Sequence, residues 1–373
     1  MRLNVNKEQF LKALLSAGKA ISPKNANAVL AGLRLELNEK GLEIIGSNSN
    51  ITIKSTVPYM IGEKEIITNP IQGSALINAH LLIEVIRRLE GETIKLDFID
   101  NSTAKIDDGR SVFKLNCSSA DEYPDIDLEP TGTVFTMPCS SLTELVEQSA
   151  FAASNKEQRF ILTASNLEAA EGKLVATATD SARLSRKSVD LDSEIRFKCN
   201  IPARALLDIV RMFETARTVE VAISDKKALF TFDNTVVSSS LVPGDYPVTR
   251  SIIPATFNYF LEVNAQELLA AMGRVAVLAS DRESVVKLSM GEDSVEISVK
   301  SQENGTANEH IQTFQYTGEK LEVSFNSLFV VDAIKALKSE DVMLCFQAEM
   351  KPFVVKNQKD DSVVELITPM RTY

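Results

Sequence analysis

An internal repeat constrains this sequence more than any other feature. Residues 3–22 align without a gap to residues 135–154, and again to residues 261–280. Self-similarity on this scale means that one structural unit recurs along the chain, which limits the architecture before any single element is assigned. The apolar columns that the three copies share are Phe10, Leu142 and Leu268, followed by Leu14, Val146 and Met272.

A second block predicts another helix in each copy, at residues 78–86, 202–210 and 326–334. Apolar residues recur there at i, i+3, i+4 and i+7, which is one face of a helix. On the opposite face an acidic residue stands three positions before a basic one, within pairing reach. These pairs are Glu84–Arg87, Asp208–Arg211 and Asp332–Lys335. The first helix of each copy begins at Asn6, Pro138 or Asn264, residue types that suit a helix start.

Between the predicted helices, apolar and polar residues alternate as they do in half-buried strands. Each copy thus holds two helices and several strands in roughly 125 residues, which predicts an α+β fold of three like domains. We place these domains at residues 1–128, 129–256 and 257–373. Three such domains are compatible with an open scaffold or with part of a closed ring, and the residues alone do not choose between them.

The composition argues against an enzyme, a metal site and a membrane protein. The chain has two His, no Trp and four widely spaced Cys, and it contains no P-loop, nucleophile-elbow or dinucleotide motif. We therefore expect no catalytic residues, no cofactor and no metal. Because there is no apolar run long enough for a membrane helix and no signal-peptide core at the start, we expect a cytoplasmic protein.

Particular strings on this triple repeat resemble the bacterial DNA polymerase III beta subunit family, the sliding clamps. The strings are residues 178–184, 244–247, 253–254, 325–326, 351–353 and 369–371. The resemblance covers essentially the whole chain. It implies a head-to-tail homodimer in which six similar domains surround a hole, with helices lining the hole and antiparallel strands outside. It also implies a processivity factor for DNA replication, a ring that encircles duplex DNA without reading its sequence.

The resemblance also implies residues for ring closure and for DNA contact. The dimer interface would include Phe113, Leu115, Val277 and Leu278. The DNA contacts would include Lys24, Lys156, Arg204 and Arg211. Core packing for the first group, and a solvated charged face for the second, explain these residues equally well. The net charge of −11 disfavours tight phosphate binding. However, the six predicted helices carry about +1 and the remainder about −12, so the face toward the hole would be nearly neutral. In full, these predicted helices span residues 7–19, 78–90, 139–153, 203–215, 265–278 and 327–338.

A peptide pocket between the second and third domains is the other site that the resemblance implies. It would take short linear motifs, typically a Gln and hydrophobic residues, from the replicative polymerase, the clamp loader and repair proteins. The matching positions are Arg159, Leu162, Thr179, Arg183, Leu184, Pro247, Ile252, Asn326, Phe329, Met350, Leu366, Pro369, Met370 and Arg371. Ser181-Ala182 departs from the family pattern, which often has Gly at the first position, so the backbone there is less permissive.

Two rival functions stay open at this stage. An enzyme would need convergent polar groups, and the only compact candidate is Asp180 with Arg183, which we interpret as a structural turn at the pocket edge. A scaffold that uses the same repeat without DNA is the second rival. Retention on circular DNA, lost when the DNA is linearised, would distinguish a clamp from a scaffold.

Overall fold

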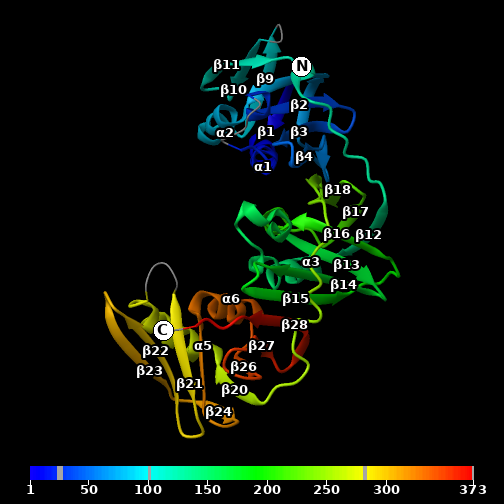
Figure 1. Cartoon of the computed structure of the whole chain (residues 1–373). Helices are drawn as coiled ribbons and strands as arrows, with labels where there is room; N and C mark the ends of the chain where they lie inside the picture. Colours follow the sequence, from blue (N-terminus) through cyan, green and yellow to red (C-terminus); the bar gives the residue numbers. More distant parts are fainter. Residues whose placement is uncertain (23–27, 100–101, 280–283, 372–373) are drawn as a thin grey trace. The chain divides into compact units, whose positions relative to one another are not determined.

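The computed structural model describes residues 1–22, 28–99, 102–279 and 284–371. The chain forms two compact units (Figure 1). One unit contains Met1–Cys139 and Arg211–Leu241, and the other contains Ser140–Val210 and Val242–Tyr373. The second repeat contributes strands to both units, so the domain boundaries of the sequence analysis stay a prediction.

The first repeat contains two α-helices within a run of antiparallel strands. Its elements are β1 (Arg2–Asn6), α1 (Lys7–Gly18), the 3-10 helix η1 (Ala28–Ala31), β2 (Gly32–Asn38), β3 (Gly41–Ser47), β4 (Ile51–Val57), β5 (Met60–Ile61), β6 (Lys64–Glu65), β7 (Ile67–Ile71), β8 (Gly73–Asn78), α2 (Ala79–Arg88), β9 (Thr93–Ile99), β10 (Thr103–Asp107), β11 (Val112–Ser118) and η2 (Ala120–Glu122).

The second repeat follows the same order of elements, without counterparts of β5, β6 and β7. They are β12 (Thr133–Pro138), α3 (Cys139–Glu147), η3 (Ala150–Ala152), η4 (Glu157–Thr163), β13 (Ala164–Ala170), β14 (Lys173–Thr179), β15 (Arg183–Asp190), β16 (Phe197–Pro202), α4 (Ala203–Val210), β17 (Thr218–Ile223), β18 (Lys227–Phe232) and β19 (Thr235–Ser240).

The third repeat completes the pattern. Its elements are β20 (Tyr259–Asn264), α5 (Ala265–Ala276), β21 (Val285–Met290), β22 (Val295–Ser301), β23 (Gly305–Ile311), β24 (Phe314–Thr317), β25 (Leu321–Asn326), α6 (Ser327–Leu337), β26 (Asp341–Phe346), β27 (Phe353–Asn357) and β28 (Asp360–Ile367). The expected α+β architecture of three similar repeats is thereby confirmed.

Strand pairing carries the sheets across the repeats. A 13-stranded sheet has the order β12-β17-β18-β19-β4-β3-β2-β8-β11-β10-β9-β1-β7, and a nine-stranded sheet has the order β16-β13-β14-β15-β28-β27-β26-β20-β24. In the first sheet β19 pairs with β4, and in the second β28 pairs with β15, both antiparallel. The sheets therefore continue from one repeat into the next. A four-stranded sheet, β23-β22-β21-β25, and the β5–β6 hairpin complete the pairing.

Each helix buries the apolar stripe that the sequence predicted. In the first repeat α1 and α2 pack together, and Phe10, Leu14, Leu82 and Ile86 lie in one buried core with the strands. In the third repeat α5 and α6 do the same around Leu268, Met272 and their neighbours. The Asn6 side chain accepts a hydrogen bond from the Gln9 amide, which caps the first helix as expected.

Two helices are shorter than the sequence predicted. The helix expected to reach residue 153 ends at Glu147, where the Ser149 hydroxyl donates to the Leu145 carbonyl and competes with the helical backbone bonds. The helix expected to reach residue 215 ends at Val210. Beyond it the Phe213 ring packs edge-on against Phe232, with 4.8 Å between the ring centroids, so tertiary packing overrides the helical pattern.

Candidate functional site

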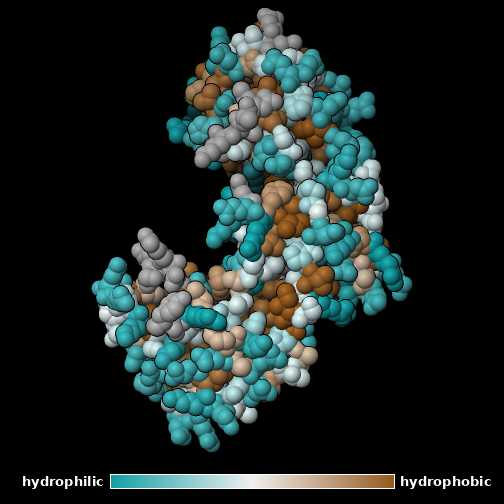
Figure 2. Space-filling model, in the orientation of Figure 1, coloured by the Kyte–Doolittle hydropathy of each residue, from teal (hydrophilic) through white to brown (hydrophobic). Residues whose placement is uncertain are grey.

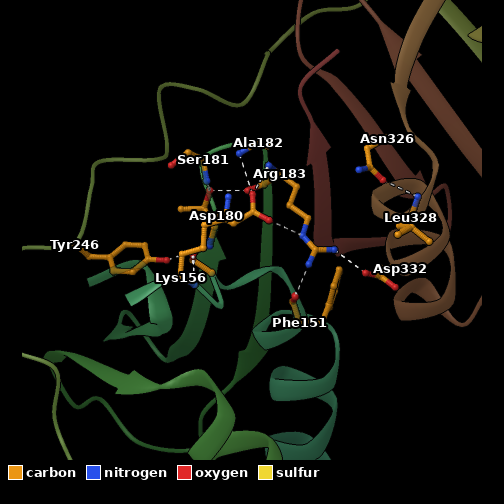
Figure 3. Close-up of polar contacts among 12 residues, drawn as sticks. Phe151, Lys156, Asp180, Ser181, Ala182, Arg183, Tyr246, Asn326, Leu328 and Asp332 are labelled. Atoms are coloured by element: carbon orange, nitrogen blue, oxygen red, sulfur yellow. Dashed lines mark hydrogen bonds and ion pairs between the residues drawn. The ribbon is translucent and has the colours of Figure 1, made fainter. Parts of the chain in front are cut away.

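Arg183, the first residue of β15, joins three segments within one compact unit (Figure 3). Its guanidinium donates to Asp180 Oδ2 at 3.1 Å, to Asp332 Oδ2 on α6 at 2.7 Å, and to the Phe151 carbonyl at 2.9 Å. Its central carbon also lies 4.7 Å from the centre of the Phe329 ring and 5.5 Å from that of Phe151. The second and third repeats are therefore linked through one largely buried cation.

The turn before Arg183 is held by its own polar side chains. Asp180 Oδ1 accepts from the amides of Ala182 and Arg183, which confirms the structural turn inferred from the sequence. The Tyr246 hydroxyl accepts from the Thr179 amide at 3.1 Å and so ties the turn to the segment after β19. Burial raises the pKa of Tyr246 to about 12, so its hydroxyl keeps its proton at neutral pH.

Ser181 occupies a backbone conformation that favours glycine. Its φ is 83°, in the left-handed region where a side chain costs about 1 kcal/mol or more. The less permissive backbone expected from the sequence is therefore real strain at the tip of this turn. The Ser181 hydroxyl receives a 2.6 Å hydrogen bond from Arg159 Nη1, and that bond offsets part of the cost.

Leu184 and Leu366 lie side by side on paired strands. They are direct partners in the β15–β28 pairing and form a small buried cluster with Val354. Ile253 and Phe257, from the segment after β19, pack against that cluster. Figure 2 shows hydrophobic side chains at the surface over this pair of strands. Apolar residues from distant parts of the sequence thus meet where β28 joins β15.

The remaining predicted pocket residues have different surroundings. Asn326 caps α6 by accepting from the Leu328 amide, and the Met370 amide donates to the Ser324 carbonyl, which holds the end of the chain beside β25. Leu162 and Pro369 are buried, Met370 is half-buried, and the exposed ones are Pro247, Ile252, Met350 and Arg371. The contacts described join Leu184 to Leu366 and Arg183 to Phe329, while these four exposed residues have no described contact to either pair.

Several residues of this site were missed by the sequence analysis. Asp332 was expected to pair with Lys335, but its ion-pair partner is Arg183. Helical spacing favoured the local partner, whereas folding supplies one that lies 149 positions away. Phe151 and Phe257 gave no local signal. Phe160 is among the most exposed large apolar residues. Its exposure could not be predicted from the sequence, because a single aromatic residue between Arg159 and Ile161 forms no pattern.

The predicted DNA-contact residues are exposed where the structure describes them. Lys156 precedes η4, Arg204 lies in the first turn of α4, and Arg211 follows that helix. Lys24 lies outside the described residues. Exposure makes these side chains available to a ligand, but it does not identify the ligand.

The predicted dimer residues lie on two elements: Phe113 and Leu115 are on β11, and Val277 and Leu278 follow α5. Phe113, on β11, is 40% exposed, and Val277, just after α5, is 77% exposed. Leu115 and Leu278 are partly buried and pack against the cores of their own repeats. β11 pairs along its length with β10, but only Cys117 and Ser118 pair with β8, so the rest of its second edge is unpaired among the described strands.

The described residues contain no cluster of three potential metal ligands, and none of their helices is long and apolar enough to cross a membrane. Two ionisable side chains are buried where β15 meets β28. Lys187 contacts Glu144, Asp360 and Ser362, and Glu365 lies beside Ser185. The arrangement resembles a junction with an adjacent apolar surface more than a catalytic centre.

Comparison with protein families finds three consecutive matches. Residues 1–127 match the N-terminal domain of the DNA polymerase III beta subunit, residues 136–248 match its central domain, and residues 250–371 match its C-terminal domain.

Whole-chain comparisons agree with these matches. The chain is 32% identical to the beta sliding clamp of Bacillus subtilis and 31% identical to that of Staphylococcus aureus, in each case over the full length of both chains. Among solved structures, the B. subtilis DNA polymerase sliding clamp superposes with a TM-score of 0.96 at 32% identity. The DNA polymerase III beta chain of Streptococcus pneumoniae gives 0.95 at 32% identity, and both cover all of this chain and of their own.

Proposed function

Because this chain belongs to the family of bacterial beta sliding clamps, the beta subunits of DNA polymerase III, we propose that it acts as a homodimeric ring around duplex DNA. The protein is a processivity factor in DNA replication and not an enzyme, and it associates with DNA polymerase III. The observation that carries the proposal is the full-length match to sliding clamps in sequence and in fold. We place its action in the cytoplasm, beside the chromosome.

Tethering explains how such a protein functions with an acidic surface. A ring that holds the polymerase near its template makes rebinding an intramolecular event at high effective concentration. Tight phosphate contacts would slow sliding, so weak attraction within the ring is sufficient. Lys156, Arg204 and Arg211 are exposed and are our candidates for that attraction, together with Lys24. Each is expected to contribute little by itself.

The strand junctions favour a ring that closes by pairing two chains. The last strand of the second repeat, β19, pairs with β4 of the first, and the last strand of the third, β28, pairs with β15 of the second. β11 is the last strand of the first repeat, so it corresponds to β19 and β28. The strand that corresponds to β4 and β15 in the third repeat is β23, and it would be the matching partner of β11. β23 is the outermost strand of its sheet. We propose that β11 of one chain pairs with β23 of a second copy, so that two equal junctions close the ring.

The β15–β28 junction is our proposed peptide site. Leu184 and Leu366 would contact hydrophobic anchors of a partner, with Ile252, Met350 and Met370 around them. Arg159 and Asn326, at the edge, would orient the polar end of the peptide. The partners would be the replicative polymerase, the clamp loader and repair proteins, each carrying a short linear motif.

The test of encirclement compares two forms of one DNA. We expect protein loaded on a nicked circular plasmid to stay bound through gel filtration and to be lost once the plasmid is cut at one site. Equal release from both forms would support a scaffold that does not encircle DNA. In solution we expect twice the mass of one chain, and a single-chain mass at micromolar concentration would contradict ring closure.

The test of the pocket uses Leu184→Ala combined with Met370→Ala. Removing two apolar anchors should weaken a fluorescent peptide bearing Gln and a Leu-Phe end by roughly tenfold or more, with the dimer intact. Val134→Ala, an exposed apolar residue on β12, is the matched control and should not change the affinity. Unchanged binding in the double variant would refute the pocket assignment.

A further inference from the structure

Glu365 on β28 is a carboxyl group in an interior position. Its side chain is only 2% exposed, and its direct neighbour across the strands is Ser185 on β15. A buried ionised carboxylate is costly unless cations or several hydrogen-bond donors surround it. The protonation state of Glu365 is therefore a structural question at the junction that forms the proposed pocket.

Counting hydrogens around Ser185 answers that question. Ser185 Oγ lies 2.6 Å from the Gln148 carbonyl oxygen and 2.8 Å from Glu365 Oε1. Both distances are those of hydrogen bonds, yet the hydroxyl has a single hydrogen and the carbonyl has none. If the hydroxyl donates to Gln148, the second bond requires a hydrogen on Glu365. A neutral Glu365 that donates to Ser185 makes both contacts ordinary hydrogen bonds, whereas an ionised Glu365 would have to share the single Ser185 hydrogen with the Gln148 carbonyl.

The surrounding charges agree with this count. Arg183 is the cation that acts on the Glu365 carboxyl, and it is already paired with Asp180 and Asp332. On the same strand the Lys187 ammonium is held by Glu144 and Asp360. Burial raises the pKa of Glu365 well above its usual range; Ser185 and Arg183 act in the opposite direction, and Asp332 raises the pKa further.

We propose that Glu365, as a neutral acid, is a positioning residue for the peptide site. This inference rests on the pocket proposed above. The Glu365 hydroxyl donates to Ser185, and the Ser185 hydroxyl donates to the Gln148 carbonyl at the end of α3. Phe151, three residues further on, provides the carbonyl and the ring that hold Arg183. The proton on Glu365 thus helps to fix the segment against which Arg183 is placed.

Loss of that proton would reverse the order of the bonds. When a base in solvent removes it, the Ser185 hydroxyl turns toward the new carboxylate, and the Gln148 carbonyl loses its donor. The buried negative charge also acts on Asp332, which is itself a partner of Arg183. The hold on residues 148–151 then weakens, and the peptide site loses affinity as the pH rises through the folded-state pKa of Glu365.

The experiment titrates the fluorescent Gln and Leu-Phe peptide against the full-length protein from about pH 6 to about pH 10. We expect the affinity of the wild type to fall roughly fivefold across this range, as the loss of one hydrogen bond would produce. Glu365→Gln keeps a neutral donor of the same shape, so it should bind like the wild type at neutral pH and show a flat profile. Ser185→Ala removes the donor to the Gln148 carbonyl and should bind more weakly than the wild type at neutral pH. Asp361→Asn, an exposed neighbour on β28, is the matched control and should follow the wild type.

A second readout separates this inference from the pocket itself. Carbon-13 NMR of the Glu365 carboxyl, assigned by comparison with Glu365→Gln, should report the neutral acid at pH 7 without peptide. An ionised carboxyl there, or identical pH profiles in the wild type and Glu365→Gln, overturns the inference even if the peptide binds well. Absence of peptide binding at every pH overturns the pocket proposal, and the positioning role with it.

Discussion

Lys187 allows a quantitative test of the junction between β15 and β28. Its side chain is 2% exposed, and Nζ lies 2.5 Å from Glu144 Oε1 on α3 and 3.2 Å from Asp360 Oδ2 on β28. Ser362 Oγ accepts from the same ammonium at 2.7 Å. The two carboxylates are far more accessible, with side chains 48% and 33% exposed. The cation is thus buried, whereas its partners remain hydrated.

This asymmetry predicts different costs for the two sides of the interaction. Lys187→Met removes the buried charge, keeps similar volume and leaves the carboxylates in water, so we expect a change within about 1 kcal/mol. Glu144→Gln with Asp360→Asn keeps the side-chain shapes but leaves the ammonium buried without a counter-charge. We expect that double variant to cost about 3 kcal/mol, because an uncompensated buried ion is far less stable than an ion pair.

Hydrogen exchange at the amides of β15 and β28 in the full-length protein measures this difference directly. The local measurement is needed because a chain with several domains does not unfold in one step. Lys173→Met is the matched control, since its exposed pair with Asp190 is worth little. If Lys187→Met proved more destabilising than the double variant Glu144→Gln with Asp360→Asn, the reasoning from burial would be wrong.

Substitutions at three other positions have defined outcomes. Ser181→Gly should relieve the left-handed strain and stabilise the turn by up to about 1 kcal/mol in thermal unfolding, and Ser181→Ala should not. Backbone amides, chiefly that of Ser111, hold the pKa of Asp108 well below its usual range. Asp108 therefore stabilises the folded protein at pH values above its unfolded-state pKa, and this stabilisation is lost as the pH falls through its folded-state pKa. Asp108→Asn should therefore abolish this dependence of stability on pH. It should also speed hydrogen exchange at the Gly91 amide, which donates a hydrogen bond to Asp108. Val277→Asp should convert the dimer to single chains in sedimentation, and a persistent dimer would exclude Val277 from the interface.

The periodic parts of the fold were predictable from the sequence. Six helices and the strand-rich segments between them follow from local pattern, because burial of one face imposes a period on the residues. The end of α3 was not predictable, since it depends on one serine hydroxyl that competes for a backbone carbonyl. A sequence pattern predicts the existence of a helix or strand more reliably than the residue at which it ends.

The polar contacts of the junction were beyond reach of local sequence. Residues 186–188, Arg-Lys-Ser, are all polar and give no local sign of burial, yet the Lys187 side chain is buried. Its enclosure is created by α3 and β28, which come from distant parts of the chain. The Arg183–Asp332 pair is of the same kind. Such contacts depend on the arrangement of whole repeats, so no local period encodes them.

Equivalent positions in the first two repeats carry different side chains at the two strand junctions. In the pairing of β4 with β19 and of β15 with β28, Thr52 stands where Leu184 stands, and Ile51 where Arg183 stands. The first junction therefore has neither the leucine nor the cation.

A similar exchange occurs on the neighbouring strands. Ile45 and Leu76 of the first repeat form a buried cluster with Tyr123, whereas the second repeat has Thr177 and Asn200 at those positions. Asn200 donates to the carbonyls of Val242 and Gly244, so it holds the following segment by hydrogen bonds. The first repeat fills this place with an apolar contact, whereas the second anchors the following segment by hydrogen bonds, and Ile253 and Phe257 of that segment pack against the buried cluster around Leu184. The same fold thus yields two junctions with different surroundings through a few side chains at matching positions.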